Sequence, residues 1–442
     1  MTQAGVPSRP RLLALLSTLR RDPLMRNSFF LMLTTGLGAG SGFFFWLIVA
    51  RLYPTVEVGQ ASSLLSSVAL LSYFSLFGFS NALIRYLPTS RNRAEDTSTA
   101  ISSVFLCGIV VSLSFALVAP LFADELGFVR SSLTHVVLFV LLATGAAVNL
   151  LTDSIFVASR ATNSNLLING VFMSIAKLAL PALAVSYGAF GIFAASGVAS
   201  TIAAVISIVA IRRNLNIAIR PRISWNAIRR MLRYSLGNYL SGSLNLIPQI
   251  ALPIIILHQL GPVAAAVYFV AFQISNLVSS ASYAIGESLF AEGSHESDSL
   301  RVLALRSGKL LLAITGAGVV IVTLLANPIL RLFGAEYAET GTTTLILFTV
   351  SSLAVAFNTW TSFLLRVTRQ LRSLVFSNVV FVLVILGVAA FKVSDGLNWA
   401  AAAWGLGNLL TGLVAGAALL PHLRRGSDAT APSTEDHQEV GA

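Results

Sequence analysis

Long apolar stretches separated by short polar breaks follow one another from residue 28 to residue 420. Each is about 20 residues long, which is the length that an α-helix needs to cross the hydrocarbon core of a bilayer. The twelve stretches cover residues 28–50, 61–84, 99–122, 133–157, 165–186, 189–211, 236–257, 263–286, 308–330, 341–365, 373–392 and 398–420. The break at Tyr187–Gly191 is the weakest, so one long kinked helix is the alternative there. The pattern predicts an all-α integral membrane protein with about twelve transmembrane helices.

The composition agrees with a membrane protein. Charged residues make up 11% of the 442 residues, whereas soluble globular chains carry about 25%. The single cysteine, Cys107, can form no intrachain disulfide. The segment Met1–Arg26 has no clean apolar core followed by a small-residue cleavage site, so we expect the first span to be retained as an uncleaved anchor.

The basic residues alternate from one loop to the next. If the N-terminus lies inside, the inner segments hold 24 of the 29 Lys and Arg residues, the outer segments hold four, and Lys177 lies within a span. Cytoplasmic loops of membrane proteins are enriched in Lys and Arg. The distribution predicts a multi-pass protein of the cell (cytoplasmic, or inner) membrane with both ends in the cytoplasm. It also accounts for the net charge of +11 without a nucleic-acid partner.

Short sequences recur at nearly one distance along the chain. Pro54 and Pro262, which follow the first and seventh spans, are 208 residues apart. Arg160 and Arg369, which follow the fourth and tenth spans, are 209 residues apart, and the asparagines nine residues later keep this offset. Each copy holds six spans, an even number, so both copies have the same orientation. We expect two parallel six-helix bundles, with a substrate cavity between them by analogy with other six-plus-six transporters.

These boundaries divide the chain into five expected parts. They are a cytoplasmic N-terminal arm (1–27), a first bundle (28–211), a basic linker (212–235), a second bundle (236–420) and a disordered cytoplasmic tail (421–442). The tail is polar and acidic, which is typical of disorder.

The end of the linker is amphipathic when drawn as a helix. Its apolar face holds Trp225, Ile228, Met231 and Leu232. Its basic face holds Arg222, Arg229 and Arg233. This pattern suits an interfacial helix on the anionic inner leaflet. Such a helix either couples two moving halves or is a surface linker with no coupling role.

Three stretches near the N-terminus resemble a known family. They begin at Trp46, Val58 and Gly78, and they read WLIVARLYP, VGQAS and GFSNALIRY. The chain is similar here to bacterial polysaccharide flippases, which move lipid-linked O-antigen or capsule oligosaccharides and belong to the multidrug/oligosaccharidyl-lipid/polysaccharide exporter (MOP) superfamily. The resemblance implies a V-shaped pair of bundles around a cationic cavity. That cavity would bind the pyrophosphate and sugars of an undecaprenyl carrier and alternate between inward-open and outward-open states.

One departure from the family bears on the substrate. Relatives that flip the peptidoglycan precursor carry arginines in the first span, whereas Phe29–Ala50 has no charge. The resemblance therefore favours an oligosaccharide other than the peptidoglycan precursor.

Lys177 is the sharpest candidate for a binding residue. It lies near the middle of the fifth span, where a charge costs about 2.5–3.5 kcal/mol. The residue 209 positions later is Leu386, so the repeat does not require a lysine. Either Lys177 faces the cavity and binds a lipid pyrophosphate or acidic sugar, or it pairs with a carboxylate or carbonyl within the bundle.

Other charged residues lie at or near the span ends. Arg85 and Arg366 end the second and tenth spans at the inner face. Arginine there can donate two hydrogen bonds to a phosphate, although the orientation rule alone also predicts it. Asp153 and Glu287 are the acids closest to span interiors. They are candidates for a proton or sodium coupling site, or else for ion-pair partners of nearby basic residues.

The sequence holds no catalytic constellation, metal-ligand spacing or nucleotide-binding motif, so we expect no enzyme activity, no cofactor and no direct use of ATP. The leading hypothesis is a flippase for a polyprenyl-pyrophosphate-linked oligosaccharide that works by alternating access in cell-surface polysaccharide biosynthesis. Its partners would be the lipid-linked glycan, membrane lipids and a polysaccharide polymerase or glycosyltransferases. The alternatives are an ion-coupled exporter of small cationic drugs, which Lys177 disfavours because it repels cations, and a non-transporting scaffold.

Overall fold

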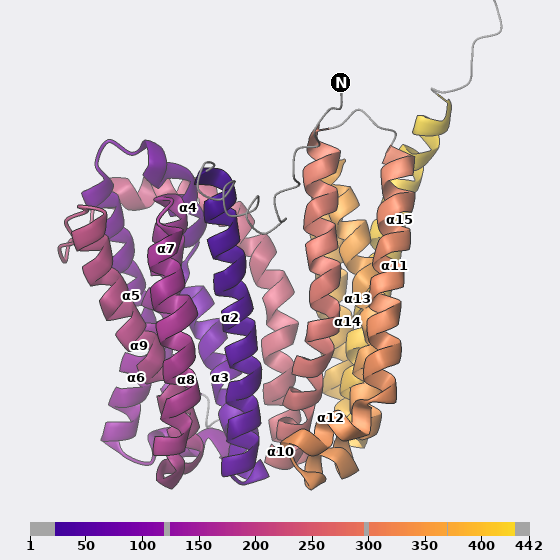
Figure 1. Ribbon diagram of the computed structural model, residues 1–442, viewed down its shortest axis with the longest axis horizontal. Coiled ribbons are helices and arrows are strands. Elements are labelled where there is room, and N and C mark those ends of the chain that lie inside the picture. The colour runs from indigo at the N-terminus through magenta and orange to yellow at the C-terminus, as the bar shows by residue number, and fades with distance from the viewer. Residues whose placement is uncertain (1–22, 119–123, 296–299, 369, 429–442) are drawn as a thin grey trace, which may run out of the picture. The chain divides into compact units, whose positions relative to one another are not determined.

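Helices form all the regular structure in the residues that the computed structural model describes, which are 23–118, 124–295, 300–368 and 370–428. The expected all-α fold is confirmed. The chain folds into two compact units. Unit 1 is Met1–Ser243 with Gly261–Ala266, and unit 2 is Leu244–Leu260 with Val267–Ala442. Within each unit the axes of the long helices are roughly aligned with one another (Figure 1).

Unit 1 holds the helices before the linker and the start of α10. They are α2 (Pro23–Leu52), α3 (Thr55–Leu76), α4 (Phe79–Tyr86), η1 (Leu87–Thr89), α5 (Arg93–Val118), η3 (Asp124–Arg130), α6 (Leu133–Ala158), α7 (Thr162–Asn165), η4 (Leu166–Phe172), α8 (Met173–Leu183), η5 (Val185–Tyr187) and α9 (Gly188–Asn214). Of these, η4 is a π-helix.

Unit 2 holds most of the remaining helices. They are the rest of α10 (Trp225–His295), α11 (Leu300–Leu324), α12 (Ala326–Phe333), α13 (Ala335–Val367), α14 (Leu371–Lys392), η6 (Val393–Asp395) and α15 (Asn398–Asp428).

The described helices account for the expected number of spans. Ten are long and apolar enough to cross a bilayer, and the pair Thr55–Leu76 and Phe79–Thr89, bent by 50°, adds an eleventh. One of the ten is Leu244–Ser280 of α10, whose 37 residues are too many for one crossing. Gly261 breaks this stretch with φ 82° and ψ 177°, so it contains two of the expected spans.

The structure confirms one weak break and changes two boundaries. A short η5 turn and Gly188, at φ 55°, separate α8 from α9, so the alternative of one long kinked helix is wrong. The expected span 308–330 is wrong at its end, because α11 ends at Leu324 and a separate helix, α12, follows. The expected span 99–122 begins six residues earlier, at Arg93, where the Asn92 side chain accepts a hydrogen bond from the Glu95 N–H at 3.2 Å and caps the helix.

Element ends repeat with the offset found in the sequence. The ends of α6 and α13, Ala158 and Val367, are 209 residues apart. The starts of α7 and α14 and the ends of α8 and α14 differ by the same number. The offset of 209 residues therefore relates the helix boundaries of the two halves as well as their residues.

Helix α6 packs closely against α9 in the middle of unit 1. A Cβ built on Gly197 would lie 2.8 Å from the Leu142 Cβ, and one on Gly145 would overlap the Thr201 side chain. Small residues at such crossings let helix backbones approach, and this van der Waals contact drives helix association in lipid. Both helices contribute buried side chains to the core of unit 1.

We therefore predict that Gly145→Leu destabilises the protein by about 1–3 kcal/mol, because the added side chain overpacks the α6–α9 contact. A lowered midpoint of thermal unfolding in detergent measures the effect. Gly387→Leu is the matched control, since a Cβ there has no atom within 4 Å. Equal midpoints for the two variants would contradict the close packing.

Candidate functional site

Helix α6 carries two polar side chains on one face, inside a membrane span. Asn149 and Asp153 are four residues apart, so they lie one above the other on the helix. Asn149 is 4% exposed, and Asp153 is partly buried. Asp153 lies five residues before the end of α6, at Ala158. Buried polar groups need hydrogen-bond partners, and the protein supplies them here.

The π-helix η4 supplies the partner. The Asn169 amide nitrogen donates to Asp153 Oδ1 and, at 2.7 Å, to Asn165 Oδ1. The Asn169 Oδ1 accepts a hydrogen bond from Asn149 Nδ2 at 2.9 Å. Single turns of π-helix occur frequently at functional sites. Here Asn169 lies in the π-helix and is hydrogen-bonded to three polar side chains, those of Asn149, Asp153 and Asn165.

Lys177 lies two helical turns after Asn169, on α8, and is partly buried. Its ammonium group and the Asp153 carboxylate attract each other, although the two do not form a direct ion pair in the described part of the chain. The two alternatives for Lys177, a cavity-facing ligand residue or a partner within the bundle, both stay predictions. Together the five residues Asn149, Asp153, Asn165, Asn169 and Lys177 form what we name the polar cluster of unit 1.

A proline opens the helix backbone beside Lys177. Pro181 lies inside α8 and has no N–H, so the Lys177 carbonyl, four residues earlier, receives no helical hydrogen bond from it. The Pro181 carbonyl accepts a hydrogen bond from the Tyr53 hydroxyl at 2.6 Å. Burial, and to a lesser extent the Glu57 carboxylate, raise the pKa of Tyr53, which lies just beyond the end of α2. The motif that ends the first span is therefore fixed to α8.

The polar cluster is where the two halves differ. At the offset of 209 residues, Asp153 corresponds to Ser362 and Lys177 to Leu386. The π-helix corresponds to a regular stretch of the α-helix α14. Asn149 corresponds to Asn358, which instead donates to Asn408 Oδ1 at 3.0 Å. The acid, the base and the π-turn thus belong to the first half only, which points to a role that the repeat scaffold does not need.

The sequence singled out Lys177 and Asp153 separately, and the structure brings them together. It does not place the other three candidates in the polar cluster. Arg85 is exposed on α4, and Arg366 is exposed at the end of α13, 4.8 Å above the centre of the Phe363 ring. Glu287 lies in a stretch of α10 whose side chains are outside the described residues.

Two members of the cluster were missed as functional candidates. Asn165 and Asn169 are spaced i, i+4 at the start of a span, and this spacing is the signal that would have revealed them. Their place in the polar cluster depends on the π-helix, which the pattern of hydrophobic residues does not predict.

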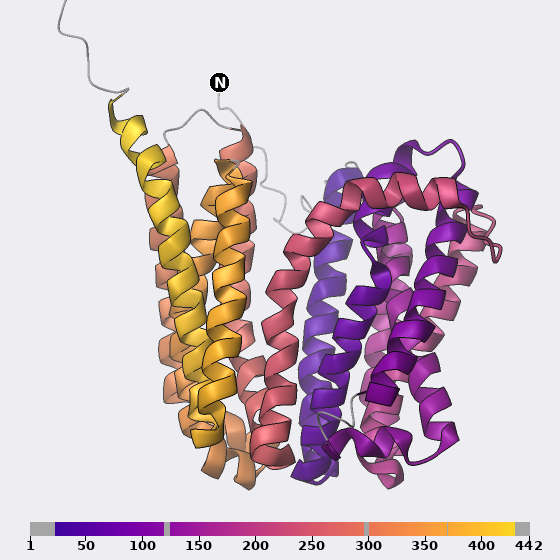
Figure 2. The ribbon, with the colours of Figure 1, turned by 180° about the vertical axis from the view of Figure 1, so that it is seen from behind.

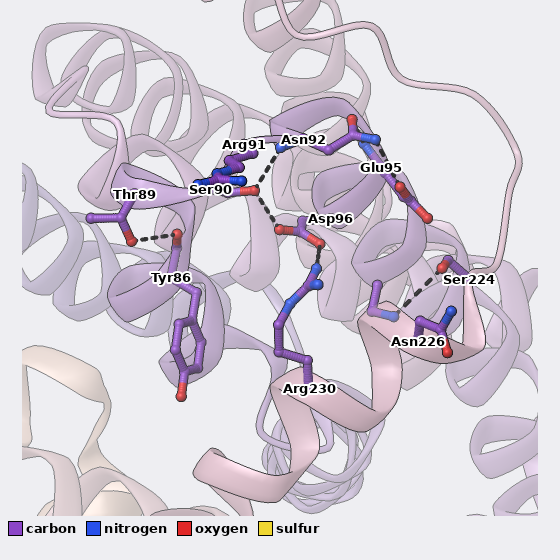
Figure 3. Close-up of a pocket in the computed structure, with 11 residues that line it drawn as sticks. Tyr86, Thr89, Ser90, Arg91, Asn92, Glu95, Asp96, Ser224, Asn226 and Arg230 are labelled. Carbon is purple, nitrogen blue, oxygen red and sulfur yellow. Dashed lines mark hydrogen bonds and ion pairs between the residues drawn. The ribbon is translucent and has the colours of Figure 1, made fainter.

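A second polar site lies at one end of unit 1, around a cavity of about 470 Å³ (Figure 3). The buried Asp96 carboxylate accepts a hydrogen bond from Ser90 Oγ at 2.7 Å and forms an ion pair with Arg230 at 2.5 Å. Arg230 belongs to the first turns of α10 and Asp96 to the first turn of α5. This site therefore joins the linker to the bundle.

The fold defines a class of protein, the multi-pass α-helical membrane proteins that share the fold of MOP-superfamily transporters and flippases. The lipid II flippase MurJ, in an inward closed conformation, matches with a TM-score of 0.69 and 13% sequence identity over 90% of this chain and 90% of that chain. An inward-facing multidrug resistance MATE family transporter of the MOP superfamily matches with a TM-score of 0.66 and 16% identity over 88% of this chain and 96% of that one. At these identities the likeness concerns the fold.

The family within this class follows from the sequence. The family model described as "Polysaccharide biosynthesis protein" matches residues 24–290, which is more than half of the 442 residues. The chain therefore belongs to the polysaccharide biosynthesis protein family, and the resemblance noted in its first two spans is confirmed. No curated protein matches the chain.

We predict that Asp153 and Lys177 are energetically coupled. Asp153→Asn and Lys177→Met each leave one charge uncompensated inside a span, whereas the double variant removes both charges. The double variant should be more stable than the sum of the two single effects implies, by about 0.5–3 kcal/mol. Chemical unfolding in detergent gives the four free energies.

The counterpart positions of the second half provide a matched control for this cycle. Ser362→Ala and Leu386→Met change the equivalent residues, which carry no charge, and their effects should add. Additivity in the first half as well would show that Asp153 and Lys177 do not interact.

Proposed function

We propose that this protein is a flippase that moves a polyprenyl-pyrophosphate-linked oligosaccharide from the inner to the outer leaflet of the cell membrane for cell-surface polysaccharide biosynthesis. Three findings support the proposal: membership of the polysaccharide biosynthesis protein family, a fold shared with the lipid II flippase MurJ, and a lysine inside a span of the first half. Transport would proceed by alternating access and without covalent chemistry.

The lysine is the observation that carries the proposal. Lys177 is retained at a depth where a charge is costly and where the repeat has a leucine. An ammonium group there suits an anionic ligand, such as a lipid pyrophosphate or an acidic sugar. Asp153 and Asn169 would hold the lysine in place between transport events, and the anionic ligand would compete with Asp153 for it. Asp153 would then be free to take up a proton or sodium ion, which would couple transport to an ion gradient.

The remaining candidates would act at the ends of the spans. Arg85 and Arg366 are exposed on α4 and α13, and their planar side chains could first capture the pyrophosphate headgroup. Glu287 stays a candidate for ion coupling. With both chain ends in the cytoplasm, as the basic residues predict, these arginines would face the side where the lipid-linked oligosaccharide is made. Glycosyltransferases and a polysaccharide polymerase would be the protein partners.

We expect that deleting the gene traps a lipid-linked oligosaccharide on the cytoplasmic leaflet, because its headgroup cannot cross the bilayer unaided. A glycan-binding probe that labels permeabilised but not intact spheroplasts measures this trapping. Restoring the gene should restore surface labelling, and resistance to cationic drugs should stay unchanged throughout.

The result that would overturn the proposal also defines the second candidate function. The fold match to multidrug resistance MATE family transporters favours an ion-coupled drug exporter on the same scaffold. Normal glycan export together with increased drug sensitivity in the deletion strain would establish that function instead. Normal glycan export with unchanged drug sensitivity would exclude both.

We predict that Lys177→Ala abolishes export at normal protein levels, whereas Lys177→Arg retains part of it, because arginine keeps the positive charge. Surface glycan per amount of membrane protein is the measurement. Lys309→Ala is the control, since it removes an exposed lysine. Equal activity of Lys177→Ala and Lys177→Arg would remove Lys177 from the mechanism.

A further inference from the structure

The linker is bound along the end of unit 1. Its extended part donates backbone N–H groups at every second residue, from Arg220, Arg222 and Ser224, to hydroxyl groups of the first turns of α5 at 3.1–3.3 Å. Because successive residues of an extended chain face opposite ways, this alternation keeps one side of the segment against the bundle.

The apolar face of the linker helix packs against the core of unit 1. Ala227 and Met231 are each 1% exposed and belong to the core of unit 1, and Ile228 and Leu232 pack against that core. The expectation that this face lies on the membrane is therefore wrong for these side chains. Trp225 is the exception, because it is 73% exposed.

The exposed side chains of the linker are largely basic. Its exposed arginines are Arg212, Arg213, Arg220, Arg222 and Arg229. They are joined by two exposed apolar side chains, Trp225 and Ile223, the latter 48% exposed. We name these seven residues the linker surface.

Few acidic residues oppose this charge. The sequence has no Asp or Glu between Asp153 and Glu287. The acids of α5 nearest to the linker are Glu95, which lies 4.0 Å from Arg222, and Asp96, which is paired with Arg230 outside the linker surface. The linker surface therefore carries a large excess of positive charge.

The linker surface lies level with the end of a membrane span. Arg212 and Arg213 are in the last turn of α9, whose apolar stretch runs over Val185–Asn214. From there the chain crosses the end of the bundle, and the first turns of α10 lie across it (Figure 2). Lipid headgroups occupy this level of a bilayer, where exposed tryptophan is favoured.

We propose that the linker surface binds the headgroups of anionic phospholipids. The arginines bind the phosphates, and Trp225 and Ile223 insert between the headgroups into the start of the acyl region. Basic residues near an anionic membrane surface each contribute to this attraction, by about fivefold in affinity. The partner is the bulk anionic lipid of the membrane rather than the transported lipid.

The test uses the full-length protein in nanodiscs that contain both phosphatidylglycerol and phosphatidylcholine, with either one or the other lipid brominated. Bromine quenches nearby tryptophan, and the difference between wild type and Trp225→Phe isolates the Trp225 signal from the other four tryptophans. We expect Trp225 to be quenched several-fold more by the anionic lipid, and the preference to fall with added salt, because salt screens exposed charges.

The variant Arg220→Gln/Arg229→Gln should lower the lipid preference strongly, by about fivefold for each arginine. These two side chains are exposed and take no part in the ion pairs of the linker with α5. Arg306→Gln/Lys309→Gln removes the same charge from exposed positions of unit 2 and should leave the Trp225 signal unchanged.

Two results would overturn the proposal. One is equal quenching of Trp225 by the two lipids, with no effect of the arginine variant. The other is a preference that arises only after a polyprenyl pyrophosphate is added, which would assign the linker surface to capture of the transported lipid. Neither outcome depends on the proposed transport function, which the deletion experiment tests separately.

Discussion

Polar groups inside a bilayer must find their hydrogen-bond partners within the protein, and the organisation of unit 1 depends on this requirement. Asp153 on α6 is a carboxylate inside a span, and Asn169 on the neighbouring π-helix donates to it. Asn169 also engages Asn149 and Asn165, so one amide serves several polar groups that would otherwise be unsatisfied. Losing that amide would expose every member of the network to an uncompensated desolvation penalty. The route of the chain from α6 to α8 is arranged around this one side chain.

Comparing the two halves of the repeat shows how the polar cluster of unit 1 differs from the matching positions of the second half. Two copies of one helical plan should carry similar residues at similar places, and the element ends of the two halves do keep one offset. The copies depart from each other at Asp153, at Lys177 and at the π-turn between them. A scaffold role would be served equally well by the serine and leucine of the second half. Under the proposed function, these two charges would serve the handling of a charged ligand.

Much of the fold could be predicted from the sequence, because hydrophobic length and basic residues are strong signals in a membrane protein. The twelve spans and the break before Pro262 came from these signals, and the repeat came from residues that recur at one offset. Other features depended on tertiary contacts. The end of α11 at Leu324 falls within an apolar stretch that continues into α12, so hydropathy alone could not place it. The apolar face of the linker helix is equally apolar whether it meets lipid or protein, and only the position of Met231 in the core of unit 1 decides between them.

The way the linker is bound has a mechanical consequence. A chain segment of this length could act as a slack tether, but its backbone is held along α5 at Arg220, Arg222 and Ser224, and Arg230 anchors the helix that follows. The segment therefore has little slack. Force applied to α10 would be transmitted directly to the first turns of α5. Inserting residues into the linker would weaken this mechanical connection.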